Sequence, residues 1–476
     1  MTAIKSAETL VADNFDHPYE NFEPIRLGYV PILEQLLPYT SMMKIAELGQ
    51  TKPNPANAWL RDDVLLLWTV TSAEITLSNS LDLGNPSNPG NFLPYPNSED
   101  DSTFSDEAER IAIGGMEAAY AFGSYTDVTS LGSFGTNVDE CFSAVFHGTF
   151  DISDSDPLDG VYDGMNEYLD TDIPFIACFP DLGETPEPAP LVIFQHGLGS
   201  DKSAIFGIAD RLAANGIASL AIDAPFHGGR AYDLGGGNYV PFFSANIMMD
   251  RLNVYQSSFD LGFPTLFAFL GGFDLNEDTV PDFAPEEIHF GAHSLGSIIG
   301  STYLNGNPVP SKAMISGLSS NLANVLDKTN IGSLGDMVES LGYTKGTAEY
   351  YVFLNLAQWL MDPVDGAYMG VGDYCIEQLM PRTDMTLAII SESDPVVPES
   401  SGRAFLKDAG INLTAVKTTD LINTALPMPG GFLYAIDGEN NPIPMDHSFE
   451  YYPDLGGDLY EVAQDQIADF FLPDDN

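Results

Sequence analysis

Residues 288–300 read IHFGAHSLGSIIG: an apolar strand pattern, a sharp corner at Ser294 and the apolar start of a helix. A strand that turns within one residue into a helix raises the corner side chain above the sheet. This is the nucleophile-elbow pattern G-x-S-x-G, with Ala292 in place of the first glycine. Because alanine still lets strand and helix pass closely, we take Ser294 as a candidate nucleophile. The alternative interpretation is a serine that caps a buried helix.

A serine hydroxyl attacks well only when a base accepts its proton and an acid orients that base. In chains with this elbow the order along the sequence is serine, acid, histidine. An apolar strand pattern at 386–390 runs into a loop with Asp394, and His447 is the one histidine after that loop. The sequence therefore predicts a catalytic triad of Ser294, Asp394 and His447.

The acid of this triad has two competitors in the sequence, Glu392 and Asp446. Asp394 fits the end of the strand best, because Pro395 and Pro398 shape the loop there. His293 lies beside the nucleophile, and we expect it to point the wrong way to act as the base.

An oxyanion hole is needed because the tetrahedral intermediate of acyl transfer carries a negative charge. The strand pattern at 190–195 ends in His196-Gly197, where glycine allows the backbone to bend. We assign the two donors to the backbone N–H groups of Leu198 and Leu295. Three residues are expected to form or brace this loop and the neighbouring turn: His196, Gly197 and His227.

The composition of the chain limits the functions open to it. With 476 residues and 44% hydrophobic residues, the chain can bury a large core. Asp and Glu outnumber Lys and Arg by 69 to 17, a net charge of −52, which excludes nucleic acid as a partner. We interpret this charge as a hydrated surface suited to high salt rather than as a site for a cationic partner. No apolar run is long enough for a transmembrane helix, and the first residues show no signal-peptide pattern.

The order of strand and helix patterns predicts two parts. Residues 1–135 form a smaller accessory domain with a strand at 61–77, and residues 136–476 form an α/β domain. In the second part, alternating apolar strands and helices predict a mostly parallel sheet with helices on both faces. The apolar, Met-rich stretch at about 318–383 interrupts this pattern. It is either a helical cap over the site or the ordinary core of an insertion.

The three cysteines cannot all pair within one chain, and no C-x-x-C spacing suggests a metal site. Cys141 and Cys178 flank the first predicted strands of the α/β domain and could form one disulfide.

The sequence DLNEDTVPD places oxygen ligands at alternate positions, as calcium loops do. It lacks the glycine and the bidentate glutamate of an EF-hand, and chance clusters are expected in so acidic a chain. A structural calcium ion and a chance cluster both stay open, and the chemistry requires no cofactor. The residues concerned are Asp274, Asn276, Asp278 and Asp282.

Several stretches, some of them outside these motifs, resemble the bacterial extracellular lipases of the Pla-1/cef type, a branch of the α/β-hydrolases. They include VIFQHGLGSDKSAI, RLAANGIASLAIDAPFHGGR, MMDRLNVYQSSFDL and LAQWLMDPVDGAYMG, and the resemblance covers residues 60–450 approximately. It implies an α/β-hydrolase fold, activity on acyl esters of small molecules or lipids, and a secreted or cell-surface location.

Three hypotheses follow from the sequence. The first is a serine carboxylic-ester hydrolase, an esterase or lipase that works through an acyl-enzyme. The second is a peptidase or amidase with the same triad. The third is a non-catalytic surface or adhesion module with the hydrolase fold. Oligomeric state is not predicted.

Overall fold

The computed structural model describes residues 2–5, 64–68, 123–148, 172–181, 187–244, 246–276, 280–307, 309–366, 385–392, 394–417, 429–436, 447–456 and 458–472. The chain divides into two compact units, residues 1–72 and 73–476. In the first unit, β1 (Thr2–Lys5) pairs antiparallel with β2 (Val64–Trp68). β2 lies inside the strand predicted at 61–77.

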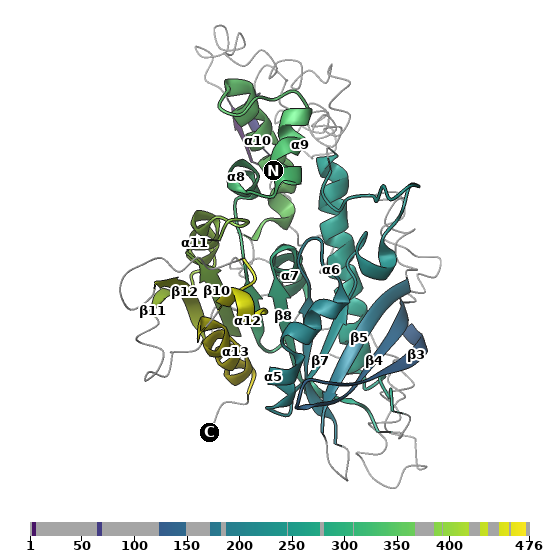
Figure 1. The fold of residues 1–476 in the computed structure, drawn as a ribbon. Coiled ribbons are helices and arrows are strands. Elements are labelled where there is room, and N and C mark those ends of the chain that lie inside the picture. The colour runs from purple at the N-terminus through teal and green to yellow at the C-terminus, as the bar shows by residue number, and fades with distance from the viewer. Residues whose placement is uncertain are drawn as a thin grey trace, which may run out of the picture. The chain divides into compact units, whose positions relative to one another are not determined.

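One sheet of ten strands forms the centre of the second unit, in the order β11-β12-β10-β9-β8-β6-β7-β5-β4-β3 (Figure 1). Neighbours from β7 to β11 pair parallel, whereas β3, β4, β5 and β7 pair antiparallel. β8, the strand that leads into Ser294, lies near the middle of the sheet. This mixed, mostly parallel sheet with helices is the predicted α/β-hydrolase fold. The strands are β3 (Gly123–Phe134), β4 (Val138–Gly148), β5 (Asp172–Pro180), β6 (Ala189–Gln195), β7 (Ala218–Ile222), β8 (Phe283–His293), β9 (Ala313–Ser316), β10 (Thr386–Ser391), β11 (Leu413–Lys417) and β12 (Gly430–Ile436).

Helices cover both faces of this sheet because alternate side chains of each strand enter different cores. Along β6, Leu191 and Ile193 pack in the core formed with α6, α7 and α11, whereas Val192 and Phe194 pack in the core formed with η7, α5 and α13. The helices of the first face are α6 (Ile247–Phe269), α7 (Leu295–Gly306) and α11 (Glu399–Asp408). Those of the second are η7 (Lys202–Gly207), α5 (Ala209–Ala213) and α13 (Asp458–Phe471).

The structure differs from the sequence prediction at one boundary and contains two strands that were not predicted. The sheet already contains β3, so the boundary predicted at 135/136 falls inside the hairpin of β3 and β4. Most of β3 is exposed, so it lacks the apolar run that would have marked it. The segment 202–216 contains two short helices, η7 and α5, which end before Gly216, whose φ is +74°. β11 and β12, at the edge beyond β10, were not predicted.

The insertion predicted at 318–383 is helical where the structure describes it. It contains α8 (Leu322–Lys328), α9 (Gly332–Ser340), α10 (Ala348–Met361) and η9 (Asp362–Val364), and residues 367–384 lie outside the described residues. α8, α9 and α10 form a group at one end of the sheet (Figure 1). Of the helices that the structure describes, none is both long and apolar enough to span a membrane.

Cys141 on β4 and Cys178 on β5 face each other in the antiparallel register and form a disulfide, with a Cα–Cα distance of 4.0 Å. Both cysteines are buried. Cys375 lies outside the described residues.

Gly296, in the first turn of α7, is fixed by the backbone of β6. A Cβ atom on Gly296 would lie 2.1 Å from the carbonyl oxygen of Gln195. We therefore expect Gly296→Ala to lower the free energy of unfolding by about 3 kcal/mol or more, measured by denaturant titration. The added Cβ would meet the backbone of β6, which cannot move aside as a side chain can.

The matched variant for this test is Gly300→Ala, on the next turn of the same helix. Its Cβ would meet the ring of Phe290 at 2.5 Å, and a side chain can adjust where a backbone carbonyl cannot. We expect a smaller loss for Gly300→Ala. Equal losses in the two variants would contradict the argument.

Candidate active site

Ser294 lies at the corner between β8 and α7 with φ 56° and ψ −118°, a conformation that costs energy for a residue with a side chain. It occupies the N-cap position of α7, but its side chain makes no capping hydrogen bond. The helix-cap interpretation of this serine therefore lacks the contact that defines a cap. The side chain is mostly buried, at 9% exposure.

Ala292 takes the place of the first elbow glycine without opening the corner. It is fully buried, and its Cβ lies 3.6 Å from the position that a Cβ on Gly300 would occupy. The methyl group of Ala292 thus packs against α7 at Gly300, which has no side chain. The elbow keeps its close approach of strand and helix through Gly296 and Gly300.

Asp394 and His447 are in contact. The Asp394 Oδ2 atom lies 2.6 Å from Nδ1 of His447, and its Oδ1 atom accepts the N–H groups of Val396 and Val397 at 2.8 and 2.9 Å. The two backbone donors orient the carboxylate, and the carboxylate in turn fixes the imidazole with its proton on Nδ1. Glu392 donates its backbone N–H to Tyr434 on β12, and Asp446 lies outside the described residues.

Ser294 and His447 line the same open pocket of about 460 Å³, a volume that includes solvent at its mouth, together with Gly197 and Leu198. The Nε2 atom of His447 is buried and has no hydrogen-bond partner among the described residues. No hydrogen bond joins it to Ser294 in the described part of the chain. Such contacts are often long in the absence of substrate.

The loop after β6 lies directly against the elbow. A Cβ atom on Gly197 would be 3.0 Å from Cβ of Ser294, so only glycine lets this backbone approach the serine so closely. Leu295 is the first residue of α7, where an N–H group has no acceptor within the helix. The predicted donors, Leu198 and Leu295, thus belong to two backbone segments that meet at Ser294.

Two neutral histidines fix this loop. His196 accepts the N–H of Ala224 at Nε2 and donates from Nδ1 to the carbonyl of Gly197; His227 accepts the N–H of Gly199 at Nε2 and donates from Nδ1 to the carbonyl of Pro225. Burial lowers the pKa of His196 to about 4, and burial also lowers the pKa of His227 below its ordinary value. Their neutral rings tie the loop to the turn after β7.

A buried ion pair that sequence reasoning missed holds the same two segments. Asp223, fully buried after β7, accepts the N–H and the ammonium of Lys202 at 2.8 Å each, and the N–H of Gly229 at 2.7 Å. Nothing in the sequence pairs these residues, since Asp223 and Lys202 belong to different predicted elements. Gly317 was missed as well: a Cβ there would lie 2.7 Å from Cε1 of His447, so this glycine makes room for the imidazole.

Buried histidines predict a pH dependence of stability. Burial lowers the pKa of His289, on β8 and remote from Ser294, to about 4, as it does for His196. The unfolded chain takes up these protons near pH 6.5 and the folded chain near pH 4. The contribution of each neutral histidine to the free energy of unfolding is therefore fully present above pH 6.5 and is lost as the pH drops to 4. The loss per group is about 3 kcal/mol below pH 4.

We expect His289→Gln to flatten the dependence of the unfolding free energy on pH between 6.5 and 4, measured by urea titration at a series of pH values. Burial raises the pKa of Asp250 to about 6, which acts in the opposite direction, but this contribution is common to wild type and variant and cancels in the difference. Parallel curves for the two proteins would contradict a buried neutral His289.

The predicted calcium loop is only partly described, because Asp278 lies outside the described residues. The Asp282 carboxylate accepts the N–H of Leu275 at 2.7 Å, so it closes the loop before β8. Within the described ranges, no three His, Cys, Asp or Glu side chains are grouped as a metal site. A calcium ion at Asp274, Asn276, Asp278 and Asp282 stays a prediction.

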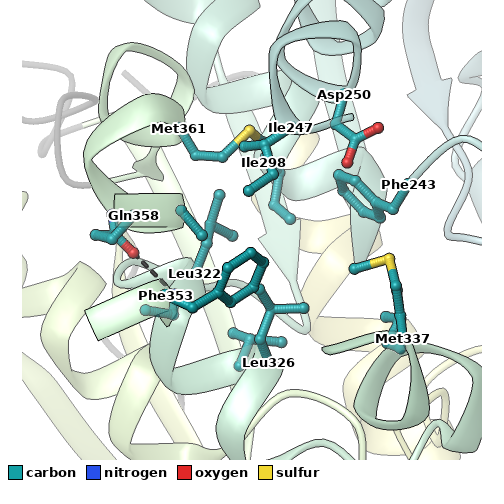
Figure 2. A pocket seen from close by; sticks show the side chains of 14 residues that line it. Phe243, Ile247, Asp250, Ile298, Leu322, Leu326, Met337, Phe353, Gln358 and Met361 are labelled. Atoms are coloured by element: carbon teal, nitrogen blue, oxygen red, sulfur yellow. Dashed lines mark hydrogen bonds between the residues drawn. The ribbon is translucent and has the colours of Figure 1, made fainter. Parts of the chain in front are cut away.

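A second, apolar pocket of about 600 Å³, a volume that includes open solvent at its mouth, lies between α6, α7 and the inserted helices α8, α9 and α10 (Figure 2). Ile298 of α7 contributes to its wall, one helical turn after Ser294. Across from it lie Met337 and Phe353, and Asp250 is at one edge beside Phe243. The two pockets share no side chain among the described residues.

No protein-family model and no curated protein matches the sequence. Among solved structures, the acetyl xylan esterase from Paenibacillus sp. R4 is 15% identical, with a TM-score of 0.44 over 78% of this chain and 96% of its own. A cold-adapted esterase from an Arctic intertidal metagenomic library is 14% identical, with a TM-score of 0.37 over 71% and 99%. Acetyl xylan esterase 1 from Thermoanaerobacterium sp. JW/SL YS485 is 14% identical, with a TM-score of 0.37 over 63% and 83%. These values are too low to carry an argument about substrate, so the chemistry must be argued from the site itself.

Proposed function

We propose that the protein is a serine carboxylic-ester hydrolase, an esterase or lipase, in which Ser294, His447 and Asp394 act as the triad. The observation that carries the proposal is the 2.6 Å contact between Asp394 and His447, in the same pocket as Ser294. Ser294 itself has a strained backbone, and its side chain makes no helix-capping hydrogen bond. A serine that caps a helix needs neither partner. Their shared cavity gives an ester carbonyl access to both the hydroxyl and the imidazole.

In the first half of the reaction, Nε2 of His447 accepts the Ser294 proton while Oγ attacks the ester carbonyl. The N–H groups of Leu198 and Leu295 hold the resulting oxyanion. The imidazolium then protonates the leaving alcohol, and an acyl-Ser294 intermediate remains. In the second half, His447 deprotonates water, which attacks the acyl carbonyl; the bond to Ser294 Oγ breaks, Oγ recovers the proton from the imidazolium, and the acid is released. Asp394 stabilises the imidazolium throughout.

We infer that the acyl chain of a small-molecule or lipid ester binds in the apolar pocket of Figure 2. The pocket lies one helical turn from Ser294 and is lined almost wholly by apolar side chains, which suits a hydrocarbon rather than a sugar or peptide. In this proposal the inserted helices form a cap that supplies one wall of the acyl site.

Narrowing the pocket should therefore shorten the preferred acyl chain. We expect Ile298→Trp and Met337→Trp, on opposite walls, to lower kcat/KM for octanoyl esters about tenfold relative to acetyl esters. The measurement is a chain-length series of p-nitrophenyl esters, with and without micelles. Two variants are needed because Ile298 is nearly buried and its variant could be destabilised. An unchanged chain-length profile in both variants would contradict the acyl assignment.

The main test of the proposal compares esters with anilides and adds a fluorophosphonate probe. We expect ester hydrolysis and probe labelling by the wild-type protein, with no labelling of Ser294→Ala. Anilide cleavage far above ester cleavage would favour a peptidase or amidase. A wild-type protein that does not label, or a variant that labels equally, would favour the non-catalytic surface or adhesion module.

The resemblance to the Pla-1/cef-type lipases extends the proposal to a secreted or cell-surface location. The disulfide between Cys141 and Cys178 supports export, because stable disulfides are rare in reducing compartments. The high negative charge suits a salty exterior, where it is screened.

A further inference from the structure

His293 and Ser448, the residues next to Ser294 and His447, are joined directly. Nε2 of His293 lies 3.0 Å from Oγ of Ser448. One residue before the proposed nucleophile thus contacts one residue after the proposed base. The link connects the corner of β8 with a segment more than 150 positions later in the chain.

Both nitrogens of His293 have partners, and its ring is buried. Nδ1 lies 3.0 Å from Oγ of Ser316 and 3.3 Å from Oε1 of Glu450, and the ring centroid is 4.7 Å from that of His447. Tyr451 packs against the same ring edge to face, at 5.0 Å. The His293 ring therefore cannot turn without losing several contacts.

Glu450 determines which nitrogen of His293 carries the proton. Its side chain is 1% exposed, and within the described ranges neither carboxylate oxygen has a hydrogen bond. A buried carboxylate attracts a nearby N–H, so Glu450, 3.3 Å from Nδ1, favours the tautomer with the proton on Nδ1. Nε2 is then the acceptor for the Ser448 hydroxyl. Burial lowers the pKa of His293, which keeps the ring neutral and Nε2 free to accept.

His447 depends on this link for its place. Its only hydrogen bond among the described residues is the one from Nδ1 to Asp394, which fixes one edge of the ring and leaves Nε2 without a partner. The position of Nε2 relative to Ser294 therefore depends on the packing of the ring against His293 and Gly317 and on the backbone at 447–448. A displacement of about 1 Å there can cost a hundredfold in rate.

We propose that His293 is a positioning residue that fixes the base His447 relative to Ser294 through Ser448, with Glu450 setting its tautomer. This inference rests on the proposed function for its catalytic consequence, but the link itself can be tested without turnover. His293 has no hydrogen bond to Ser294 or to the His447 ring in the described part of the chain; it holds the loop of His447 through Ser448 and packs against the His447 ring.

The test uses Ser448→Ala, which keeps the His293–Glu450 contact, together with His293→Phe, which keeps the ring but loses both nitrogens. The matched control is His289→Phe: His289 is another buried histidine on β8, bonded to Ser311 at 2.8 Å and far from the loop of His447. His293→Gln is the conservative variant, because its amide can still reach Ser448.

The first readout is the strongly deshielded proton resonance of the Nδ1–H between His447 and Asp394. We expect it in the wild-type protein, in His289→Phe and in His293→Gln, and we expect it to be lost or broadened in Ser448→Ala and His293→Phe. Its absence from the wild type, or its survival in both variants, would overturn the proposal. This readout decides the matter even if the protein hydrolyses no ester.

The second readout is kinetic. We expect Ser448→Ala and His293→Phe each to lower kcat about 10- to 100-fold with little change in KM, and the double variant to lose no more than the worse single variant. His293→Gln should recover most of the rate. Fully additive losses of kcat in the double variant, or a rise in KM with unchanged kcat, would overturn the positioning role. If the wild-type protein hydrolyses no ester, that result counts against the proposed function only.

Discussion

Replacing Ser294 by alanine is expected to lower kcat for ester hydrolysis by about 10⁴-fold or more while the protein stays folded. In the proposed mechanism the hydroxyl oxygen forms the acyl-enzyme, and without it only the oxyanion donors and substrate binding would act. The loss should fall on kcat rather than on KM, because the side chain contributes little to holding the substrate. Initial rates with a soluble p-nitrophenyl ester measure it.

Ser301→Ala provides the matched control for this loss. Ser301 is a buried serine two turns further along α7, and its hydroxyl donates to the carbonyl of Ser297 at 2.7 Å. Ser301→Ala also removes a serine hydroxyl, from the helix that Ser294 begins, so the rate of this variant should stay near that of the wild type. A tenfold or smaller loss in Ser294→Ala would remove this serine from the mechanism.

Replacing Asp394 by asparagine is expected to lower kcat by about 10⁴-fold, because an amide cannot hold the imidazole in the useful tautomer or stabilise its charged form. The fold should survive, since the amide oxygen can still accept the N–H groups of Val396 and Val397. Circular dichroism and thermal unfolding check this second point.

The comparison that makes this test sharp is with the two neighbouring carboxylates. Glu392→Gln and Asp446→Asn should each change kcat by less than about threefold, since in this proposal neither contacts the imidazole. A large loss of kcat in Glu392→Gln or Asp446→Asn, together with a small loss in Asp394→Asn, would assign the role of the acid to that other carboxylate.

The central fold was predictable because its strands are fully buried and therefore apolar along their whole length. Residues 190–195 and 386–390 were identified as strands for this reason, and both belong to the sheet. β3 was not predicted because most of this edge strand is exposed and its sequence carries no apolar run. The two-part organisation of 1–135 and 136–476 stays a prediction, apart from the shift caused by β3.

The site was predictable only as far as chain order constrains it. The elbow sequence and a single downstream histidine were enough to nominate Ser294 and His447, and the contact between Asp394 and His447 is as expected. The supporting contacts were not predictable. Glu450, Asp223 and Gly317 act through neighbours distant in the sequence, and a carboxylate or glycine in a loop carries no pattern that reveals such a partner.

The bridge between Cys141 and Cys178 has a consequence for how the chain can be cut. It spans residues 142–177, so a protease that cleaves between 149 and 171 would leave two fragments covalently attached. Such a nicked protein would migrate as one species on a denaturing gel without reductant and separate into two with it. Cleavage in that segment would therefore not release the edge hairpin, because the disulfide would still join β4 to β5 after the peptide bond was cut.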